Sequence, residues 1–474
     1  MKIIKNILYT TLIVPTLLSG CDVENPNITD EVYLTTPEVT KTWLNGLRRQ
    51  FALTINQAVV SSELVSDNYF NNRTLSSKVF DIPQIDYFDL DVNNLQVAVH
   101  RLREMSEYGI NTIVNSDAST TANDRAEILF INAYAHLLSG ELFVSLPTAR
   151  GAVAITPQEH FRMAITSLDQ AIDLQTIANE KLVYNIVKAR AYYDLGDAAN
   201  ATRFANEALS NKTLLKQVTF DGVNGVSNDF QTYIFSSTTN EFAPLPRLDY
   251  LDPKYYHVGT ANQEQKPVSI AKAEEAYLII AEAQISSGDL AAGKTTLKNM
   301  LDEVVSKRPT VSLDDKKETR NGGNRTDYAL TAANLKFDPA APVKSGYVLN
   351  RQAGNITAYT ISGTKVTAQD IDNTTSQDDL MYILYLLRQE IFFAEGRRMT
   401  DLGIKFPVSQ TEQLNNSNIT SQDIKAQIPA FIPLNRGMDD FTYDRTSNLV
   451  TMKFDMNKIL VQNKQAKEIF PFLN

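Results

Sequence analysis

RQEIFFAEGRRMTDLG, residues 388–403, is the stretch of this sequence that says most about the fold. Bulky apolar side chains such as Phe392 and Phe393 lie here among acids and arginines. An apolar run of this kind belongs in a protein interior, where charges must be paired or hydrogen-bonded. The stretch therefore predicts either a catalytic site or an internal helix held by a polar network. We favour the structural network over the catalytic site.

The sequence around this stretch predicts one helix over residues 376–402. Acids follow a serine at its start, where the helix dipole favours them, and apolar residues then return at helical spacing. Gly396 is unfavourable inside a helix, so we expect another backbone to pack against it. Same-face spacing would pair neighbouring charges along this helix, namely Glu395 with Arg398 and Arg397 with Asp401.

Helix pairs with small residues at their seams fill much of the chain. Residues 179–210 read as two helices that turn at Gly196, and the second helix carries several alanines. The same pattern returns at 271–304 around Gly288, and a weaker copy begins near residue 123. Tetratricopeptide repeats have this helix–turn–helix character. We therefore predict tetratricopeptide-like pairs around 123–210 and 271–304, at irregular spacing.

Two long insertions separate and follow these helices, at residues 211–268 and 308–373. The first is rich in aromatic residues, and the second is polar, with a predicted hairpin between YVLN (347–350) and ITAYTISGTKVTA (356–368). Long loops in compact proteins are usually functional or disordered. We expect function to lie in these insertions, carried on the helical frame.

The start of the chain reads as a lipoprotein signal. Two lysines precede an apolar stretch that is too short for a membrane span, and Leu-Ser-Gly leads to Cys21, the single cysteine. We predict that residues 1–20 are removed, that Cys21 is lipidated and that residues 21–30 form a tether. Acylation at this cysteine would anchor the protein to a membrane.

Charge and motifs exclude several classes of protein. Without the signal peptide, 43 basic residues remain against 55 acidic ones, a net charge of −12, which argues against nucleic-acid binding. We find no nucleotide-binding, serine-hydrolase or zinc-protease motif. Asp86, Asp89 and Asp91 with Asn93 could offer oxygens to calcium, but they lack the glycine and glutamate of a calcium loop. We therefore expect a solvated acidic turn, and neither catalytic residues nor a cofactor.

Residues 390–402, EIFFAEGRRMTDL, resemble the C-terminal motif of the SusD/RagB family of surface nutrient-binding lipoproteins. Residues 246–255, 273–283 and 429–438 resemble further segments of that family. The resemblance, with the lipoprotein signal, spans nearly the whole chain. The motif residues that carry it are Glu390, Glu395, Gly396, Arg397, Arg398 and Asp401.

The resemblance implies a mostly α-helical, SusD-like fold over residues 31–474, with tetratricopeptide-like pairs packed against an irregular, loop-rich half. It also implies a place on the outer-membrane surface and a SusC-like, TonB-dependent transporter that the lipoprotein covers as a lid. The lid binds an oligomer for import and performs no covalent chemistry.

The ligand is less defined by sequence. Sugars suit flat aromatic rings with nearby hydrogen-bonding groups. The single tryptophan, Trp43, lies in a predicted amphipathic helix and reads as core, so a stacking platform must use Tyr or Phe. The loop SDNYFNNRT (66–74) and the aromatic residue after Asp86 are the best candidates, which gives Asp67, Tyr69, Asn71, Asn72, Arg73 and Tyr87. We favour an oligosaccharide and keep three alternatives, namely a peptide binder, a helical interaction scaffold and a surface glycan hydrolase.

Overall fold

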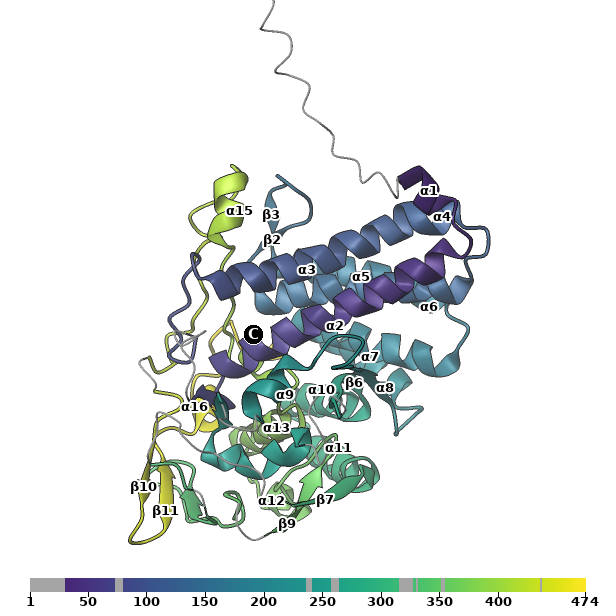
Figure 1. Cartoon of the computed structure of the whole chain (residues 1–474). Coiled ribbons are helices and arrows are strands. Elements are labelled where there is room, and N and C mark those ends of the chain that lie inside the picture. The colour runs from purple at the N-terminus through teal and green to yellow at the C-terminus, as the bar shows by residue number, and fades with distance from the viewer. Residues whose placement is uncertain are drawn as a thin grey trace, which may run out of the picture.

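The computed structural model describes residues 30–72, 80–235, 241–256, 264–314, 327–329, 331–350, 354–434 and 437–474. The lipidation site predicted at Cys21 and the ligand residue predicted at Arg73 lie outside these ranges. Long helices dominate the described chain and pack in layers, while the strands are short and distributed over several parts of the molecule (Figure 1). The predicted mostly α-helical class is confirmed.

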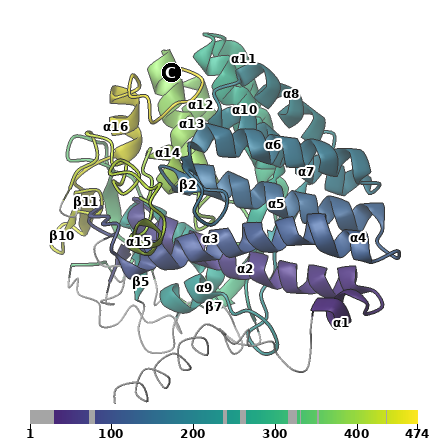
Figure 2. The same cartoon turned by 90° about the horizontal axis from the view of Figure 1, so that it is seen from above.

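Four helices form the first layer, in which each packs against the next in chain order (Figure 2). They are α2 (Val39–Val65), α3 (Leu90–Tyr108), α5 (Ala122–Leu142) and α6 (Pro157–Leu174). Their starts are encoded locally. Thr156 accepts a hydrogen bond from the backbone N–H of Glu159, whose carboxylate returns to Thr156. This capping box, with proline at the first helical position, stabilises the helix start that the sequence predicts at residues 156–157.

Two helix pairs continue the stack. The first joins α7 (Ala178–Asp194) to α8 (Ala198–Ala208), and the second joins α10 (Ala273–Ser286) to α11 (Leu290–Glu303). Gly196 and Gly288 turn the chain between the members of each pair with φ of 73° and 89°, a region that favours glycine. The predicted turn at Gly196 is therefore confirmed.

The remaining helices are short, apart from α13. They are α1 (Asp30–Leu34), α4 (Val114–Ser116), α9 (Asp229–Ile234), α12 (Ala368–Asp372), α13 (Gln377–Ile391), α14 (Arg398–Asp401), α15 (Gln410–Asn415) and α16 (Met456–Gln462), with a π-helical turn at Gly109–Ile113 and 3-10 helices at Pro246–Tyr255 and Val305–Lys307.

The strands pair mostly in twos. Antiparallel pairs join β1 (Tyr69–Asn71) to β5 (Phe242–Pro244), β2 (Leu146–Pro147) to β3 (Ala154–Ile155), β4 (Leu215–Val218) to β6 (Val268–Lys272), and β7 (Thr310–Asp314) to β9 (Asn355–Tyr359); β10 (Phe441–Asp444), β11 (Leu449–Met452) and β8 (Asn334–Lys336) form a three-stranded sheet. The hairpin predicted between 347–350 and 356–368 is wrong, because β9 pairs with β7 across the whole second insertion.

The quoted C-terminal stretch does not form one continuous helix, so that prediction is wrong. Helix α13 ends at Ile391, a turn follows, and α14 begins at Arg398. Ala394 and Gly396 adopt left-handed conformations, with φ of 60° and 73°. A Cβ added at Gly396 would lie 3.4 Å from the Cα of Val59 in α2. The expected close approach of another backbone is therefore confirmed, although Gly396 lies in a turn between two helices and not inside one helix.

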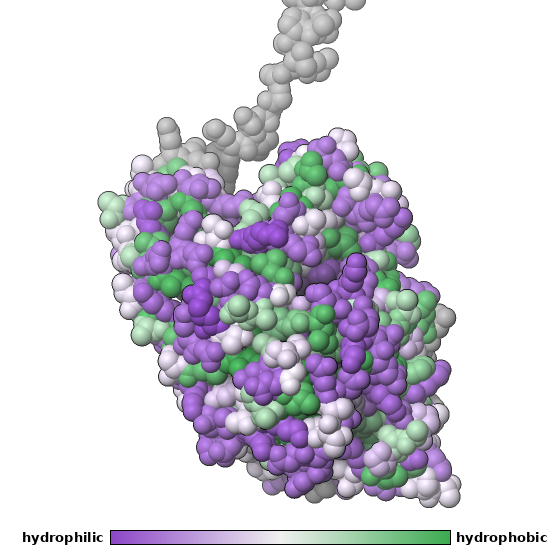
Figure 3. Space-filling model, turned by 180° about the vertical axis from the view of Figure 1, so that it is seen from behind, coloured by the Kyte–Doolittle hydropathy of each residue, from purple (hydrophilic) through white to green (hydrophobic). Residues whose placement is uncertain are grey.

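Most of the described apolar interior belongs to one large cluster, and a small second cluster is formed by Tyr256, Leu313 and Ala358. On the face seen in Figure 3, hydrophilic residues alternate with smaller groups of hydrophobic ones. None of the described helices combines the length and apolar character needed to cross a membrane.

Candidate functional site

The charged residues of the C-terminal motif form a buried network that joins distant parts of the chain. Arg398 donates to Asp67, at 2.5 Å from Nε to Oδ1, and both side chains are almost fully buried. Burial opposes ionisation of Asp67, but Arg398 outweighs it and holds the pKa of this carboxyl below its ordinary value. Arg388 binds Asp401 at 2.6 Å. These contacts attach the motif to the end of α2 and to α13.

Glu395 and Arg397 lie in the turn between the two helices and bind partners elsewhere. Glu395 accepts from Lys254 at 2.8 Å and from Lys272 at 2.7 Å. Arg397 and Arg190 both donate to Glu275, at 2.9 Å and 2.6 Å.

Glu390 accepts from the hydroxyl of Thr364 and from the backbone N–H of Lys365. The prediction that Glu395 pairs with Arg398 and that Arg397 pairs with Asp401 is wrong, because each of these residues binds another partner. The interpretation of the motif as a structural polar network is supported, because each of these charged side chains binds a polar or charged partner inside the protein, in most cases from a distant part of the chain.

The structure places most of the predicted ligand residues in the interior. Tyr69 is fully buried, stacks on Phe393 with 5.0 Å between ring centroids, and donates to Asp252. A ring enclosed in this way cannot present a face to a sugar, and Asp67 is occupied by Arg398. For these two residues the expected exposed loop is therefore wrong, since β1 carries the segment into the core.

Asn71 and Asn72 lie at the end of β1 and are also buried, at 7% and 5% exposure. Tyr87 lies elsewhere, half-buried beside the exposed Phe88, with 5.6 Å between ring centroids. Ligand binding by these three residues stays a prediction.

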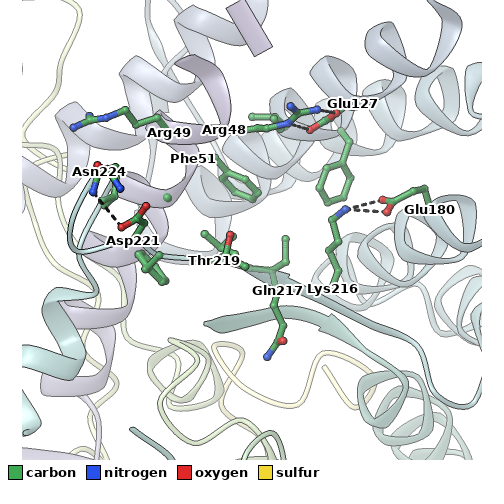
Figure 4. A pocket seen from close by; sticks show the side chains of 18 of the residues that line it. Arg48, Arg49, Phe51, Glu127, Glu180, Lys216, Gln217, Thr219, Asp221 and Asn224 are labelled. Carbon is green, nitrogen blue, oxygen red and sulfur yellow. Dashed lines mark hydrogen bonds and ion pairs between the residues drawn. The ribbon is translucent and has the colours of Figure 1, made fainter. Parts of the chain in front are cut away.

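A pocket of about 430 Å³ lies between α2, α5, α7 and the segment that follows β4, and we call it the α2–α5–α7 pocket (Figure 4). Small-molecule sites have volumes of roughly 300–1,000 Å³. Phe51, Phe130 and Tyr184 lie at its inner end, where they are almost fully buried and Phe130 stacks on Tyr184 at 4.7 Å between centroids. The half-buried Phe220 adds a further ring from the segment after β4.

Two ion pairs form one part of the rim of the pocket. The guanidinium of Arg48 meets Glu127 in a bidentate pair, with both N–O distances at 2.6 Å. Lys216 at the start of β4 binds both oxygens of Glu180, at 2.9 Å and 3.0 Å. Each glutamate is therefore engaged by a cation through both oxygens, and the charges of these two pairs offset each other.

The segment after β4 closes the opposite side of the pocket. Asp221 accepts from the backbone N–H groups of Val223 and Asn224, at 2.9 Å and 3.1 Å, and these bonds lower the pKa of its carboxyl. The bonds hold the segment in a turn. Thr219, which is exposed, presents its side chain at the centre of the pocket in Figure 4.

This pocket was only half predicted. Residues 216–226 belong to the insertion 211–268 that the sequence marks as functional, whereas Arg48 and Glu127 lie on ordinary amphipathic helices without a distinguishing signal. Among the described residues, no group of three or more His, Cys, Asp or Glu side chains is placed to hold a metal ion. Asp89 instead caps α3 by accepting from the backbone of Asp91.

Comparison with known proteins identifies the architecture. A SusD superfamily protein from Bacteroides vulgatus matches 82% of this chain and 98% of its own, with a TM-score of 0.54 at 10% sequence identity. The chain has the SusD-like fold.

Two further solved structures agree with this SusD-like fold. A SusD superfamily protein from Bacteroides thetaiotaomicron matches 82% of this chain and 98% of its own, with a TM-score of 0.52 at 12% identity. A SusD-like carbohydrate binding protein from Bacteroides vulgatus matches 76% and 82%, with a TM-score of 0.51 at 12% identity. No family model matches the sequence, and no curated protein matches it. The similarity to these proteins is therefore seen in the three-dimensional structure and hardly in the sequence.

Proposed function

We propose that this protein is a SusD/RagB-type lipoprotein that binds oligosaccharides in the α2–α5–α7 pocket. The observation that carries the proposal is the joint presence of the SusD-like fold and a pocket that offers the half-buried ring of Phe220 and a polar rim. Sugars present apolar C–H faces to rings and hydroxyls to polar groups, so this lining suits them. One solved protein of this fold is described as carbohydrate binding.

The proposal extends to location and delivery. Lipidation at Cys21 would tether the protein to the outer membrane, on the cell surface, beside a SusC-like TonB-dependent transporter that receives the ligand. The sequence supports this through its signal and through its motif resemblance. Replacement of Cys21 by serine should release the protein from membranes, and the wild-type lipoprotein should co-purify with a TonB-dependent barrel.

Binding without catalysis fits the pocket. Its carboxylates are already engaged: Glu127 and Glu180 each give both oxygens to a neighbouring cation, and Asp221 accepts from two backbone N–H groups. Glycoside hydrolysis needs one carboxyl to donate a proton and another to act as a base or nucleophile. Ligand that is recovered intact after long incubation is therefore the expected result, and release of shorter products would support the hydrolase alternative.

Isothermal titration calorimetry with neutral oligosaccharides and with peptides of matching length tests the ligand class. Thr219→Val removes one exposed hydroxyl from the pocket, and loss of one hydrogen bond of about 1 kcal/mol weakens binding about fivefold. Thr295→Val, on the exposed face of α11, is the matched control and should leave affinity unchanged. Binding of peptides alone would support the peptide alternative, and equal affinities in both variants would remove the α2–α5–α7 pocket as the site.

A further inference from the structure

Exposed apolar side chains gather around the short helix α15. Of the twelve large apolar side chains that are exposed in the described chain, five come from α15 and two segments beside it, and we call these five the α15 patch: Phe88, Leu90, Val97, Val153 and Leu414. Each of them is between 43% and 76% exposed. Single exposed apolar residues are normal, but a contiguous patch with a polar edge marks a surface for another molecule.

Hydrogen bonds hold the segments of the α15 patch together. The backbone N–H of Gln410, at the start of α15, donates to the carbonyl of Tyr87 at 2.7 Å, which places α15 against the residues that lead into α3. The side chain of Asn416, just after α15, donates to the carbonyl of Ala152 at 2.8 Å, which places it against the turn between β2 and β3. The five apolar residues therefore belong to one surface.

A groove of about 300 Å³ lies between α3 and α15 and continues the patch. Its lining includes exposed side chains from both helices, namely Val97, Arg101 and Glu104 from α3 with Thr411 and Asn415 from α15. Protein interfaces place apolar anchors in recesses of this kind and surround them with polar residues. The groove is therefore open to a side chain from a partner.

The α15 patch lies at the end of the molecule where the described chain begins. Helix α1, which starts at Asp30, occupies this end together with α15 and the β2–β3 strands (Figure 1 and Figure 2). Residues 22–29 separate Asp30 from Cys21, and an extended chain spans at most about 3.6 Å per residue, so an anchor at Cys21 lies within about 30 Å of α1. Under the proposed lipidation, this end of the protein stays close to the membrane and to proteins embedded in it.

The charges at the edge of the patch decide between a lipid surface, a second copy and another protein. Acidic side chains outnumber basic ones there, with Asp86, Asp89, Asp91, Glu104 and Glu412 against Arg101, Arg150 and Lys425. Surfaces that enter lipid headgroups are rich in lysine and arginine, and a symmetric dimer would set one acidic edge against the other. An apolar protein surface with basic residues around it is the complement of this patch.

We propose that the α15 patch is the surface through which this protein docks on a membrane-embedded protein, the SusC-like transporter of the proposed function. The matching surface of the barrel carries apolar residues with lysines or arginines around them. The inference rests on the proposed lipid anchor and transporter, and it adds the face of this chain that makes the contact. The groove shares no lining residue with the α2–α5–α7 pocket, so docking and sugar binding can be measured separately.

Thermophoresis in detergent tests this surface, with the transporter that co-purifies with the wild-type lipoprotein as the probe. Leu414→Ser and Phe88→Ser each remove an exposed apolar side chain, and we expect each to weaken the affinity for the transporter at least about tenfold, the effect of losing one buried apolar contact. Because both positions are exposed, the melting temperatures should stay at the wild-type value.

Val343→Ser is the matched control. Val343 is 54% exposed and lies close to β8, which pairs with β11 at the opposite end of the molecule (Figure 1). This variant should keep the wild-type affinity for the transporter. In cells, Leu414→p-benzoylphenylalanine should crosslink to the extracellular side of the transporter on illumination.

The outcomes separate this inference from the proposed function. Wild-type affinity of both patch variants for the transporter, or a crosslink from position 414 to lipid or to a second copy of the chain, would overturn the docking surface and leave the transporter role standing. Absence of any transporter from the wild-type preparation would retract both. A lower affinity of Phe88→Ser for oligosaccharides in calorimetry would assign the patch to the ligand site instead, whereas failure of the wild-type protein to bind oligosaccharides would leave the docking surface standing.

Discussion

The most demanding consequence of the buried network concerns Glu395, which lies between two lysines. Its carboxylate accepts from Lys254 and Lys272 at 2.8 Å and 2.7 Å, and the three side chains are between 1% and 6% exposed. Glu395→Gln keeps the shape of the side chain and removes its charge. Two ammonium groups then remain buried without a counter-ion, which is the costly situation in a protein interior.

The expected cost follows from this geometry. Removal of one partner from a buried ion pair destabilises a protein by about 3–5 kcal/mol, and here one substitution strands two cations. We therefore expect the upper end, about 5 kcal/mol, which is a large share of the 5–15 kcal/mol that typically separates folded from unfolded chains. The matched control is Glu38→Gln. Glu38 pairs with Lys41 at 2.6 Å, but both side chains are more than half exposed, so the control should cost between 0 and about 1 kcal/mol.

The effect should also depend on pH in a defined direction. Burial already lowers the pKa of Lys272, and loss of Glu395 removes a group that raises it. The folded variant then binds fewer protons than the unfolded chain below the ordinary lysine pKa of about 10.4, so its stability rises with pH. We expect the deficit relative to wild type to shrink between pH 7 and pH 9.

Guanidinium unfolding followed by circular dichroism at these two pH values measures both effects. A loss below 1 kcal/mol at pH 7, or a loss that does not change with pH, would refute the assignment of Glu395 as the counter-ion of two buried lysines.

Three further predictions concern the same interior. Arg398→Met should destabilise the fold by about 3–5 kcal/mol by stranding Asp67, and combining it with Asp67→Asn should recover part of that loss in denaturant titrations; additive losses would contradict the pairing. His136 and His160 contact each other at 3.0 Å, and burial lowers their pKa values to about 3 and about 4, so they are neutral when folded and take up protons on unfolding below pH 6.5. The free energy of unfolding should therefore be unaffected by these histidines above pH 6.5 and should fall by about 2 kcal/mol for each of them at pH 5. Unfolding curves at several pH values measure this, and His136→Phe should show a weaker dependence of stability on pH. Gly396→Ala should cost at least about 1 kcal/mol, because φ is 73° and the new Cβ approaches α2; an unchanged melting temperature would argue against this turn.

What the sequence determined by itself was local. Capping residues such as Thr156 lie within three positions of their partners, and Gly196 satisfies a backbone conformation at its own position, so these helix starts and turns could be predicted without tertiary information. The motif 390–402 likewise pointed to the SusD-like fold through its resemblance, and most of its charged side chains are buried in this protein. Even the need for a polar network followed from charges placed in an apolar run.

The partners inside that network were decided by tertiary structure. Arg398 binds Asp67, 331 residues away, and Glu395 binds Lys272, 123 residues away. Helical spacing had suggested nearer partners, but those pairs assume an unbroken helix, and packing against α2 turns the chain at Gly396 instead.

The candidate sites were decided in the same way. Tyr69 carries the residue type of a sugar platform, yet β1 takes it into the core. The α2–α5–α7 pocket gathers residues from four segments that no local pattern connects. A side chain's chemistry is written in the sequence, but its neighbours and its exposure depend on which surfaces the helices bury against one another.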